Sequence, residues 1–407
     1  MNLKSYFCTS IIAFNLINLS LNAMDTTFGS PTTFISGPRF ATKNLTSFDS
    51  AISYYKADSS YNCKGQKTAL FSYGGGEDLL KRFVDQSLPK TDTSSVGKAL
   101  IGGKFTFENY SLAYTQNLGE NFYFSLESSL SNVDVRNLTI NPISTNGHCL
   151  SASEINANPT LKNYLTKLDK LIYSDDKIAF FYNVIGPSFL TAGYTKHFQD
   201  FSYIDFIDAT LFTGIAIPII NISNKSTTIF SVPIYNYVCL GVPLQASVMV
   251  ALYDWLNIGG NALVIPFIQS ESIVALNRTK TNNVIFLTES GQASINHQPF
   301  VYFDSYIQAE QLIPHLSFTA AASYMKQNKT IYEALDQVKF PKDIINAFPA
   351  HRPWQAAYVT LCAEIDLATE SYKNLPHFQI VYVLPIWGKS VFKTWAISAQ
   401  MSIDIIW

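Results

Sequence analysis

The chain has 407 residues, of which 14% are charged and 14% are aromatic, and its formal net charge is −2 at pH 7. Soluble domains contain about 25% charged residues, so the composition is more apolar than that of an ordinary soluble domain. The sequence has no basic run, which argues against electrostatic binding of nucleic acid or of an anionic lipid surface.

The first 23 residues resemble a secretory signal peptide. Lys4 supplies a positive charge, and a moderately apolar stretch follows and ends at Ala23. Cys8 precedes most of that stretch, which argues against an acylated lipoprotein cysteine. We therefore expect residues 1–23 to be a cleaved signal peptide.

An N-terminal segment and a first strand are expected next. We expect residues 24–64 to form a periplasmic or plug segment, residues 65–407 to form one domain, and residues 67–75 to be its first strand. The glycine-rich residues 73–83 lack the Gly-Lys-Ser/Thr element of a phosphate-binding loop, so they predict a flexible strand end that leads into a short loop helix.

Five strand pairs follow, each with apolar residues at every second position, which is typical of strands with one apolar face. Mostly short turns within the pairs predict hairpins, centred near Gly119, Asp200, Asp254 and Pro314 and, in the last pair, after Ile365. The predicted apolar rows are Tyr110, Leu112 and Tyr114 with Phe122, Phe124, Leu126 and Leu130; Leu190, Ala192 and Tyr194 with Ile207, Ala209, Leu211, Ile215 and Ile217; Leu244, Ala246, Val248, Val250 and Leu252 with Leu263, Ile265 and Phe267; Phe303, Ile307 and Ala309 with Leu316, Phe318, Ala320, Ala322 and Tyr324; and a strand from Trp354 to Ile365 with Phe378, Ile380, Tyr382 and Leu384.

The longest connection between pairs contains leucines at helical spacing. The residues at helical spacing are Leu161, Tyr164, Leu165, Leu168 and Leu171, and they predict a helix. Such a helix can fold into a barrel as a constriction or pack as a lid over its outer rim, and we favour the lid.

Residues 226–253 contain no charge, which is compatible with a transmembrane helix. Pro233, Gly241 and Pro243 interrupt this stretch, and Leu244 begins a row of period two. A helical membrane protein is therefore one rival fold. A soluble secreted β-sandwich or solenoid is the other, because hairpins with one apolar face can also pack face to face.

The chain ends on a strand whose alternate residues are all apolar. About thirteen tilted residues at roughly 3.3 Å each span the apolar thickness of a membrane. The row consists of Trp395, Ile397, Ala399, Met401, Ile403, Ile405 and Trp407.

Short turns within pairs contrast with long connections between them, over residues 137–187, 218–241, 268–300 and 327–353. With the signal peptide and the aromatic C-terminal residue, this pattern resembles bacterial outer-membrane β-barrels of the porin-like class. The resemblance implies an all-β, antiparallel up-and-down transmembrane barrel of about 12 strands, within a range of about 10 to 14, with long extracellular loops and short periplasmic turns. It also implies that the barrel assembly machinery reads the terminal strand.

The rows opposite the apolar ones should face the lumen, and their charges are mostly acidic. Carboxylates near an aqueous mouth attract cations, although solvated interfacial residues explain them equally well. The candidates are Glu127, Asp208, Asp304, Glu310, Glu364, Asp366 and Asp404.

Motifs for metal, cofactor or catalytic sites are not recognisable. The four cysteines after residue 23 lack metal-ligand spacing, and the six histidines are scattered. A disulfide between Cys149 and Cys239 and unpaired thiols are both compatible with the sequence. We therefore expect no metal, no cofactor and no enzymatic activity.

The expected function is a porin-like channel for passive passage of small solutes across the bacterial outer membrane. The alternative is a structural or surface-interaction barrel with a plugged lumen. The expected partners are outer-membrane lipid, the barrel assembly machinery and small solutes, without nucleic acid; the oligomeric state does not follow from the sequence.

Overall fold

The fold comes from a computed structural model. It describes residues 25–26, 45–72, 77–80, 95–119, 121–144, 150–157, 159, 162, 165–166, 178–185, 188–199, 201–217, 220–221, 234–235, 239–276, 289–346, 353–367 and 376–406.

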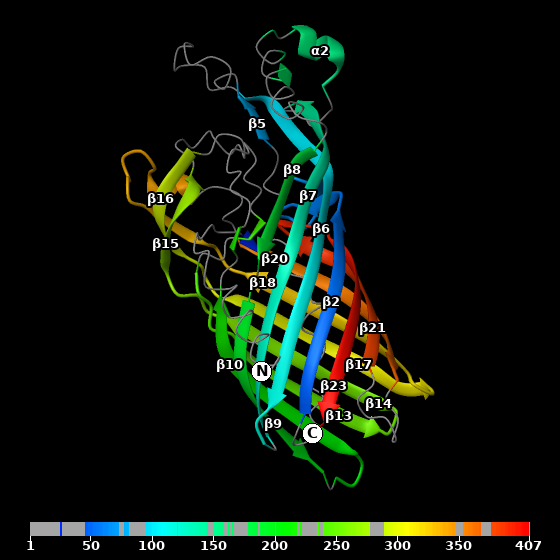
Figure 1. The fold of residues 1–407 in the computed structure, drawn as a ribbon. Helices are drawn as coiled ribbons and strands as arrows, with labels where there is room; N and C mark the ends of the chain where they lie inside the picture. Colours follow the sequence, from blue (N-terminus) through cyan, green and yellow to red (C-terminus); the bar gives the residue numbers. More distant parts are fainter. Residues whose placement is uncertain are drawn as a thin grey trace, which may run out of the picture.

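Twelve antiparallel strands form a closed barrel (Figure 1). The first wall strand pairs with the last, from Leu45 opposite Ile406 to Lys56 opposite Trp395, and this pairing closes the sheet. The closed sheet overturns both rival folds. Around the barrel the strands are β2 (Leu45–Ala57), β6 (Ser95–Asn117), β7 (Phe122–Ser144), β9 (Ser188–Phe198), β10 (Phe206–Ile217), β13 (Leu244–Tyr253), β14 (Leu256–Ile265), β17 (Phe300–Ile313), β18 (Leu316–Gln327), β20 (Trp354–Asp366), β21 (Pro376–Lys389) and β23 (Trp395–Ile406).

The five predicted hairpins are confirmed as β6–β7, β9–β10, β13–β14, β17–β18 and β20–β21. Their turns lie at the end of the barrel where β2 begins and β23 ends, which we call the short-turn end. The other end is the long-loop end, and β6 and β7 continue beyond the barrel there (Figure 1).

The alternation of apolar and polar residues separates outward from inward side chains. On β2, Phe48 and Ile52 are 48% and 59% exposed, whereas Ser53 and Tyr55 between the outward positions are buried. Most of the predicted apolar rows lie outward in the same way. Since β-strands expose alternate residues on opposite faces, each wall strand contributes one row to the lumen.

The expectation that residues 67–75 form the first strand of the barrel wall is wrong. The barrel begins at Leu45, so the expected boundary between residues 64 and 65 also moves, because β2 pairs on both edges with β6 and β23. The outward row of β2 contains the polar residues Ser50 and Lys56, so the alternation of apolar and polar residues does not indicate a strand here.

Part of the expected first strand lies in a small sheet at the long-loop end. This sheet consists of β3 (Ser59–Tyr61), β4 (Lys67–Ala69) and β22 (Val391–Phe392). This sheet and the residue that follows β4 contact the long-loop ends of β6 and β21, the strands on either side of the β2–β23 pair. Phe71 N–H donates to the Ile101 carbonyl of β6, and the Tyr61 hydroxyl lies 3.4 Å from the Ile386 carbonyl of β21. The sheet therefore braces the seam where the barrel closes.

The predicted facing of β14 is also wrong. Leu263 and Ile265 are buried in the inward row, and the outward row runs through Ile258, Ala262 and Val264. Both rows of this strand are apolar near Ile265, so alternation alone cannot say which of them faces out.

Three long connections fold into one packed unit at the long-loop end. It contains β15 (Ser270–Leu276), β16 (Glu289–Asn296), β19 (Ile331–Ala334) and α4 (Lys342–Ile345), so two segments expected as loops contain strands. Its buried core consists of Cys239, Leu276, Ala293, Ile295, Tyr332, Ala334, Phe340 and Ile345.

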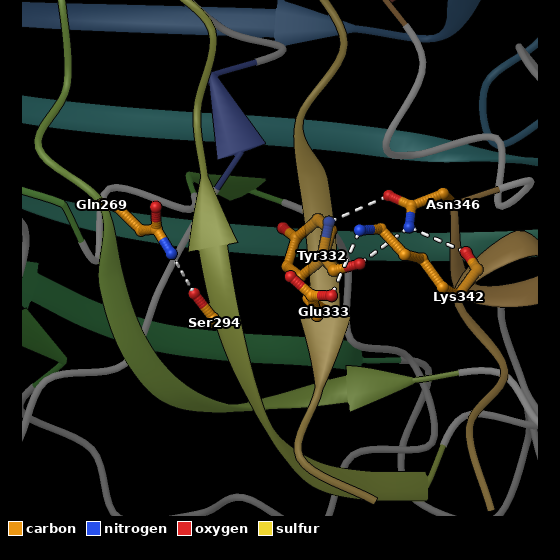
Figure 2. A network of polar contacts seen from close by, with 6 residues as sticks. All are labelled: Gln269, Ser294, Tyr332, Glu333, Lys342 and Asn346. Carbon is orange, nitrogen blue, oxygen red and sulfur yellow. Dashed lines mark hydrogen bonds and ion pairs between the residues drawn. The ribbon is translucent and has the colours of Figure 1, made fainter. Parts of the chain in front are cut away.

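Polar contacts hold this unit around its core (Figure 2). The Asn346 side chain accepts from Tyr332 N–H at 2.9 Å and donates to the Tyr332 carbonyl at 2.7 Å, and Lys342 pairs with Glu333 at 3.2 Å. Gln269 Nε2 donates to Ser294 Oγ at 2.6 Å. These contacts tie the start of β15 to β16 and tie β19 to α4, and strand pairing joins β16 to β19.

The remaining described elements are short. No helix in the described part of the chain is long and apolar enough to cross a membrane. The helix predicted from Leu161 falls mostly outside the described residues; Lys162, Leu165 and Thr166 are helical. The other elements are β1 (Asp25–Thr26), β5 (Glu77–Leu80), α2 (Ala152–Ala157), β8 (Ile178–Ile185), β11 (Ile220–Asn221) and β12 (Ile234–Tyr235).

Candidate functional site: the lumen

The side chains that line the lumen are more polar in the short-turn half than in the long-loop half. In the short-turn half, the described inward rows contain carboxylates, amides and hydroxyls, and no lysine or arginine. Lys389, at the long-loop end, lies opposite Gln355 and therefore belongs to an outward row. The inward rows of the long-loop half are mainly aromatic and aliphatic and are buried: Tyr55, Phe105, Phe107, Val135, Leu263, Ile265, Phe300, Tyr302, Met325, Trp354, Tyr358, Val381 and Val383.

Four of the predicted acidic residues gather around the β2, β7, β20 and β23 part of the wall. His377 joins two of them: its Nδ1 lies 2.9 Å from Asp366 Oδ1, and its Nε2 lies 3.3 Å from Asp404 Oδ2. Glu364 accepts a hydrogen bond from Gln379 at 3.1 Å. Glu127 occupies the inward row of β7.

The other three predicted acidic residues gather on β10 and β17. Asp208, Asp304 and Glu310 all lie within electrostatic range of Tyr306. Asp208 pairs with His197 at 2.6 Å, and Asp304 accepts two contacts from Asn261 Nδ2 at 2.8 and 3.0 Å. The structure thus brings the seven predicted residues together as two groups and not as one ring.

Sequence reasoning missed three residues of these groups. Asp49 lies within electrostatic range of Asp404, His377 and Glu127, but it fell in the segment expected to precede the barrel. In the sequence, His377 and His197 are two of six scattered histidines without a recognisable motif. Their inward positions, one residue before Phe378 and one residue before Phe198, were the available signal.

The outward faces form an apolar belt with aromatic contacts toward both ends. Near the short-turn end, the Phe48 and Tyr114 rings lie 5.1 Å apart, and the Phe122 and Tyr194 rings also lie 5.1 Å apart. Toward the long-loop end, Trp395 lies 5.9 Å from Tyr54. All described members of the predicted terminal row, Trp395 to Ile405, lie on this outward face, and Trp407 falls outside the described residues.

Cysteines and metal ligands add no further site. Cys239 is free, and its sulfur contacts Ser270 Oγ at 3.2 Å in the core of the long-loop unit; Cys149 falls outside the described residues. Among the described residues, no three metal-ligating side chains lie together.

No protein-family model matches the chain, and no curated protein matches it. Solved structures do. An outer membrane channel from Pseudomonas putida F1 is 9% identical, with a TM-score of 0.48, over 91% of this chain and 100% of that one. The transport unit of the autotransporter AIDA-I from Escherichia coli is 7% identical, with a TM-score of 0.40, over 93% and 95% of the two chains. The Pseudomonas putida toluene transporter TodX is 8% identical, with a TM-score of 0.31, over 94% and 95%.

Proposed function

We propose that the chain is a bacterial outer-membrane β-barrel that forms a cation-preferring channel for small solutes. The observation that carries this proposal is the charge of the inward rows. In the described short-turn half they contain carboxylates without a lysine or arginine to balance them. Fixed charges on a low-dielectric wall project into a narrow pore and raise the local concentration of counter-ions.

The outer surface supports a membrane location. Leu112, Leu211 and Ile380 are between 60% and 69% exposed on outward rows, which would be costly as a continuous surface in water. Outward lysines lie at Lys56 and Lys326 near the long-loop end and limit the apolar belt there. Lipid is therefore the proposed partner of the outward rows, and the barrel assembly machinery is the proposed reader of β23. The proposal assigns no enzymatic reaction.

Reversal potentials in planar bilayers test the channel. Under a salt gradient, we expect cation preference that weakens as the Debye length falls from about 10 Å at 0.1 M salt to about 3 Å at 1 M. Neutralising Glu310, Glu364, Asp366 and Asp404 with Gln or Asn should reduce the preference. Asp254→Asn, in an exposed turn, is the control and should leave it unchanged. Anion preference in the unaltered protein would contradict the proposal.

A plugged barrel with a structural or surface-interaction role is the second candidate. The burial of the inward side chains of the long-loop half favours it, since Tyr302, Met325 and Trp354 are at most 2% exposed. Absence of any conductance from protein that is correctly inserted would support this candidate over the channel.

A further inference from the structure

Lysines gather on the outer side of the barrel at the long-loop end, beside the seam. Strand register sets Lys326, Gln355 and Lys389 in one outward row across β18, β20 and β21. On β2, Lys56 lies opposite Trp395 of β23. The six partly or fully exposed lysines at this place, which we call the cationic rim, are Lys56, Lys64, Lys67, Lys326, Lys389 and Lys393.

Two of these lysines belong to the small sheet and not to the barrel wall. Lys64 and Lys67 flank Gly65 between β3 and β4, and a Cβ at Gly65 would lie 3.1 Å from Trp387 Nε1. Trp387 lies opposite Ala357, in an outward row. The turn therefore packs against the outer side of β21 and adds its two charges to those of the wall.

The cationic rim has little negative charge to balance it. In the described segments that form it, residues 56–69, 326–331, 353–357 and 385–395, Asp58 is the one acidic residue. None of the six lysines forms an ion pair with a described carboxylate. The net charge of the whole chain is −2, so this surface has the opposite sign to the chain as a whole.

The far side of the barrel has no such surface among its described residues. There the outward rows of β10, β13, β14 and β17 end at the long-loop side with Ile217, Leu244, Val264 and Val301. Lysines that served only to limit the apolar belt would be expected on all sides. A one-sided cluster indicates a partner at one place.

Tryptophan rings lie beneath two of the lysines. Lys56 Nζ lies 5.8 Å from the Trp395 ring centroid, and Lys389 Nζ lies 5.3 Å from the Trp387 ring. The Trp395 ring is also 5.9 Å from that of Tyr54. Tryptophan and tyrosine concentrate at the level of lipid headgroups, and lysines at the ends of spanning segments extend their ammonium groups into that layer.

We propose that the cationic rim binds the phosphate-bearing headgroup of a lipid in the outer leaflet. The phosphate oxygens accept from the ammonium groups, and the acyl chains lie on the outward row through Ile397, which is 44% exposed and lies between Tyr54 and Tyr382 in register. Clusters of lysine beside a membrane-facing surface attract anionic headgroups. The proposal goes beyond the channel and rests on the proposed function in taking the outward rows to face lipid.

The fold assembles this surface from separate parts of the chain. The lysines come from four places, at residues 56, 64–67, 326 and 389–393, so the sequence shows no basic run. The proposal therefore departs from the expectation that the chain does not bind an anionic lipid surface. An acidic protein would match the charge as well, but the continuity of the cationic rim with the lipid-facing belt favours a lipid.

Binding to the purified full-length barrel in neutral detergent tests the proposal without requiring conductance. The probes are bisphosphorylated lipid A and the same lipid without its phosphates, measured by microscale thermophoresis. The phosphorylated lipid should bind at least about tenfold more tightly, and its binding should weaken as salt shortens the Debye length. Inorganic phosphate at the same concentration should not displace it, because phosphate alone lacks the acyl chains.

Neutralising variants locate the site. Lys56→Gln, Lys389→Gln and Lys393→Gln together should weaken binding of the phosphorylated lipid by about a hundredfold, at about fivefold for each lysine. A second variant, Lys64→Gln with Lys67→Gln, changes only the exposed turn and should weaken binding by about tenfold or more. It keeps the test decisive if the triple variant does not fold.

Lys196→Gln is the matched control. Lys196 Nζ lies 5.2 Å from the Phe198 ring, so it repeats the contact of a lysine with an outward aromatic ring, but at the short-turn end. Its replacement should leave binding unchanged, and Lys389→Arg, which keeps the charge, should retain it. Circular dichroism and heat-modifiable gel mobility verify that each variant is folded.

Equal affinity for the phosphorylated and dephosphorylated lipids, or unchanged binding in both neutralising variants, would overturn the site. Tighter binding of a polyglutamate peptide than of the phosphorylated lipid would overturn the lipid as its occupant. Bilayer conductance without lipid binding would overturn the site and leave the channel standing. Lipid binding without conductance would support the site and overturn the channel.

Discussion

Tyr123 lies flat against the lumen wall because its neighbour has no side chain. Tyr123 on β7 lies opposite Gly193 on β9, and the three atoms nearest to a Cβ at position 193 would all belong to the far end of the tyrosine side chain. The absence of a side chain at Gly193 therefore lets a large inward ring lie close to the wall. Tyr306 on β17 lies over Gly259 on β14 in a similar way.

Gly193→Ala should narrow the lumen at this residue. The added methyl group must displace the Tyr123 ring away from the wall, at an overpacking cost of about 1–3 kcal/mol in stability. Single-channel recording should show lower conductance than the unaltered protein. The double variant Gly193→Ala with Tyr123→Ala should restore conductance, and a persistent loss in the double variant would show that the ring is not responsible.

At the scale of elements, β23 makes a direct test of facing possible. Ala399 lies outward between Ile52 and Ile380, which are 59% and 60% exposed, whereas the next residue, Gln400, belongs to the inward row. Ala399→Arg should destabilise the inserted barrel by about 2–4 kcal/mol, because the charge enters the middle of the lipid-facing belt. Gln400→Arg places the same side chain in the lumen and should be tolerated. Urea titrations of the folded barrel in liposomes measure the difference, and equal effects would mean that β23 does not face lipid.

At the scale of the whole molecule, Cys63 reports the orientation, because it is exposed whereas the other described cysteines, Cys239 and Cys362, are buried. Cys63 lies in the turn between β3 and β4 at the long-loop end and is exposed, whereas Cys239 is buried in the long-loop unit. Burial raises the pKa of the Cys239 thiol and so lowers its thiolate fraction.

A membrane-impermeant maleimide should therefore label intact cells at Cys63. Cys149 is replaced by Ser so that Cys63 is the reactive cysteine, and mass spectrometry locates the label. Labelling that appears only after the outer membrane is permeabilised would place the long loops on the periplasmic side. Cys63→Ser should abolish the signal.

The strand pairs were predictable because their signal is local. In β6 and β7, Tyr110, Leu112, Phe122 and Leu126 alternate with polar residues around the turn at Gly119, whose φ of +89° suits glycine. A period of two and a turn residue are properties of neighbouring positions, so they can be read without knowledge of the fold.

The seam and the facing of β14 were not predictable in this way. β2 is identified as a wall strand by its pairing with β23, about 350 positions away in the chain. Leu263 and Ala262 are both apolar, so only the register with Tyr302 and Phe303 on β17 decides which of them faces the lumen. These choices depend on partners far away in the chain.

The sequence by itself therefore determined the class of fold, the five hairpins, the outward row of the last strand and the acidic residues of the opposite rows. Only the tertiary structure decided which of those acids lie together. Asp366, His377 and Asp404 come from three strands, and the His377 ring contacts both carboxylates because the register of β20, β21 and β23 sets the three residues on the same or adjacent inward rows. Register is fixed by hydrogen bonds along whole strands and by closure of the barrel, so it is a property of the sheet and not of any single segment.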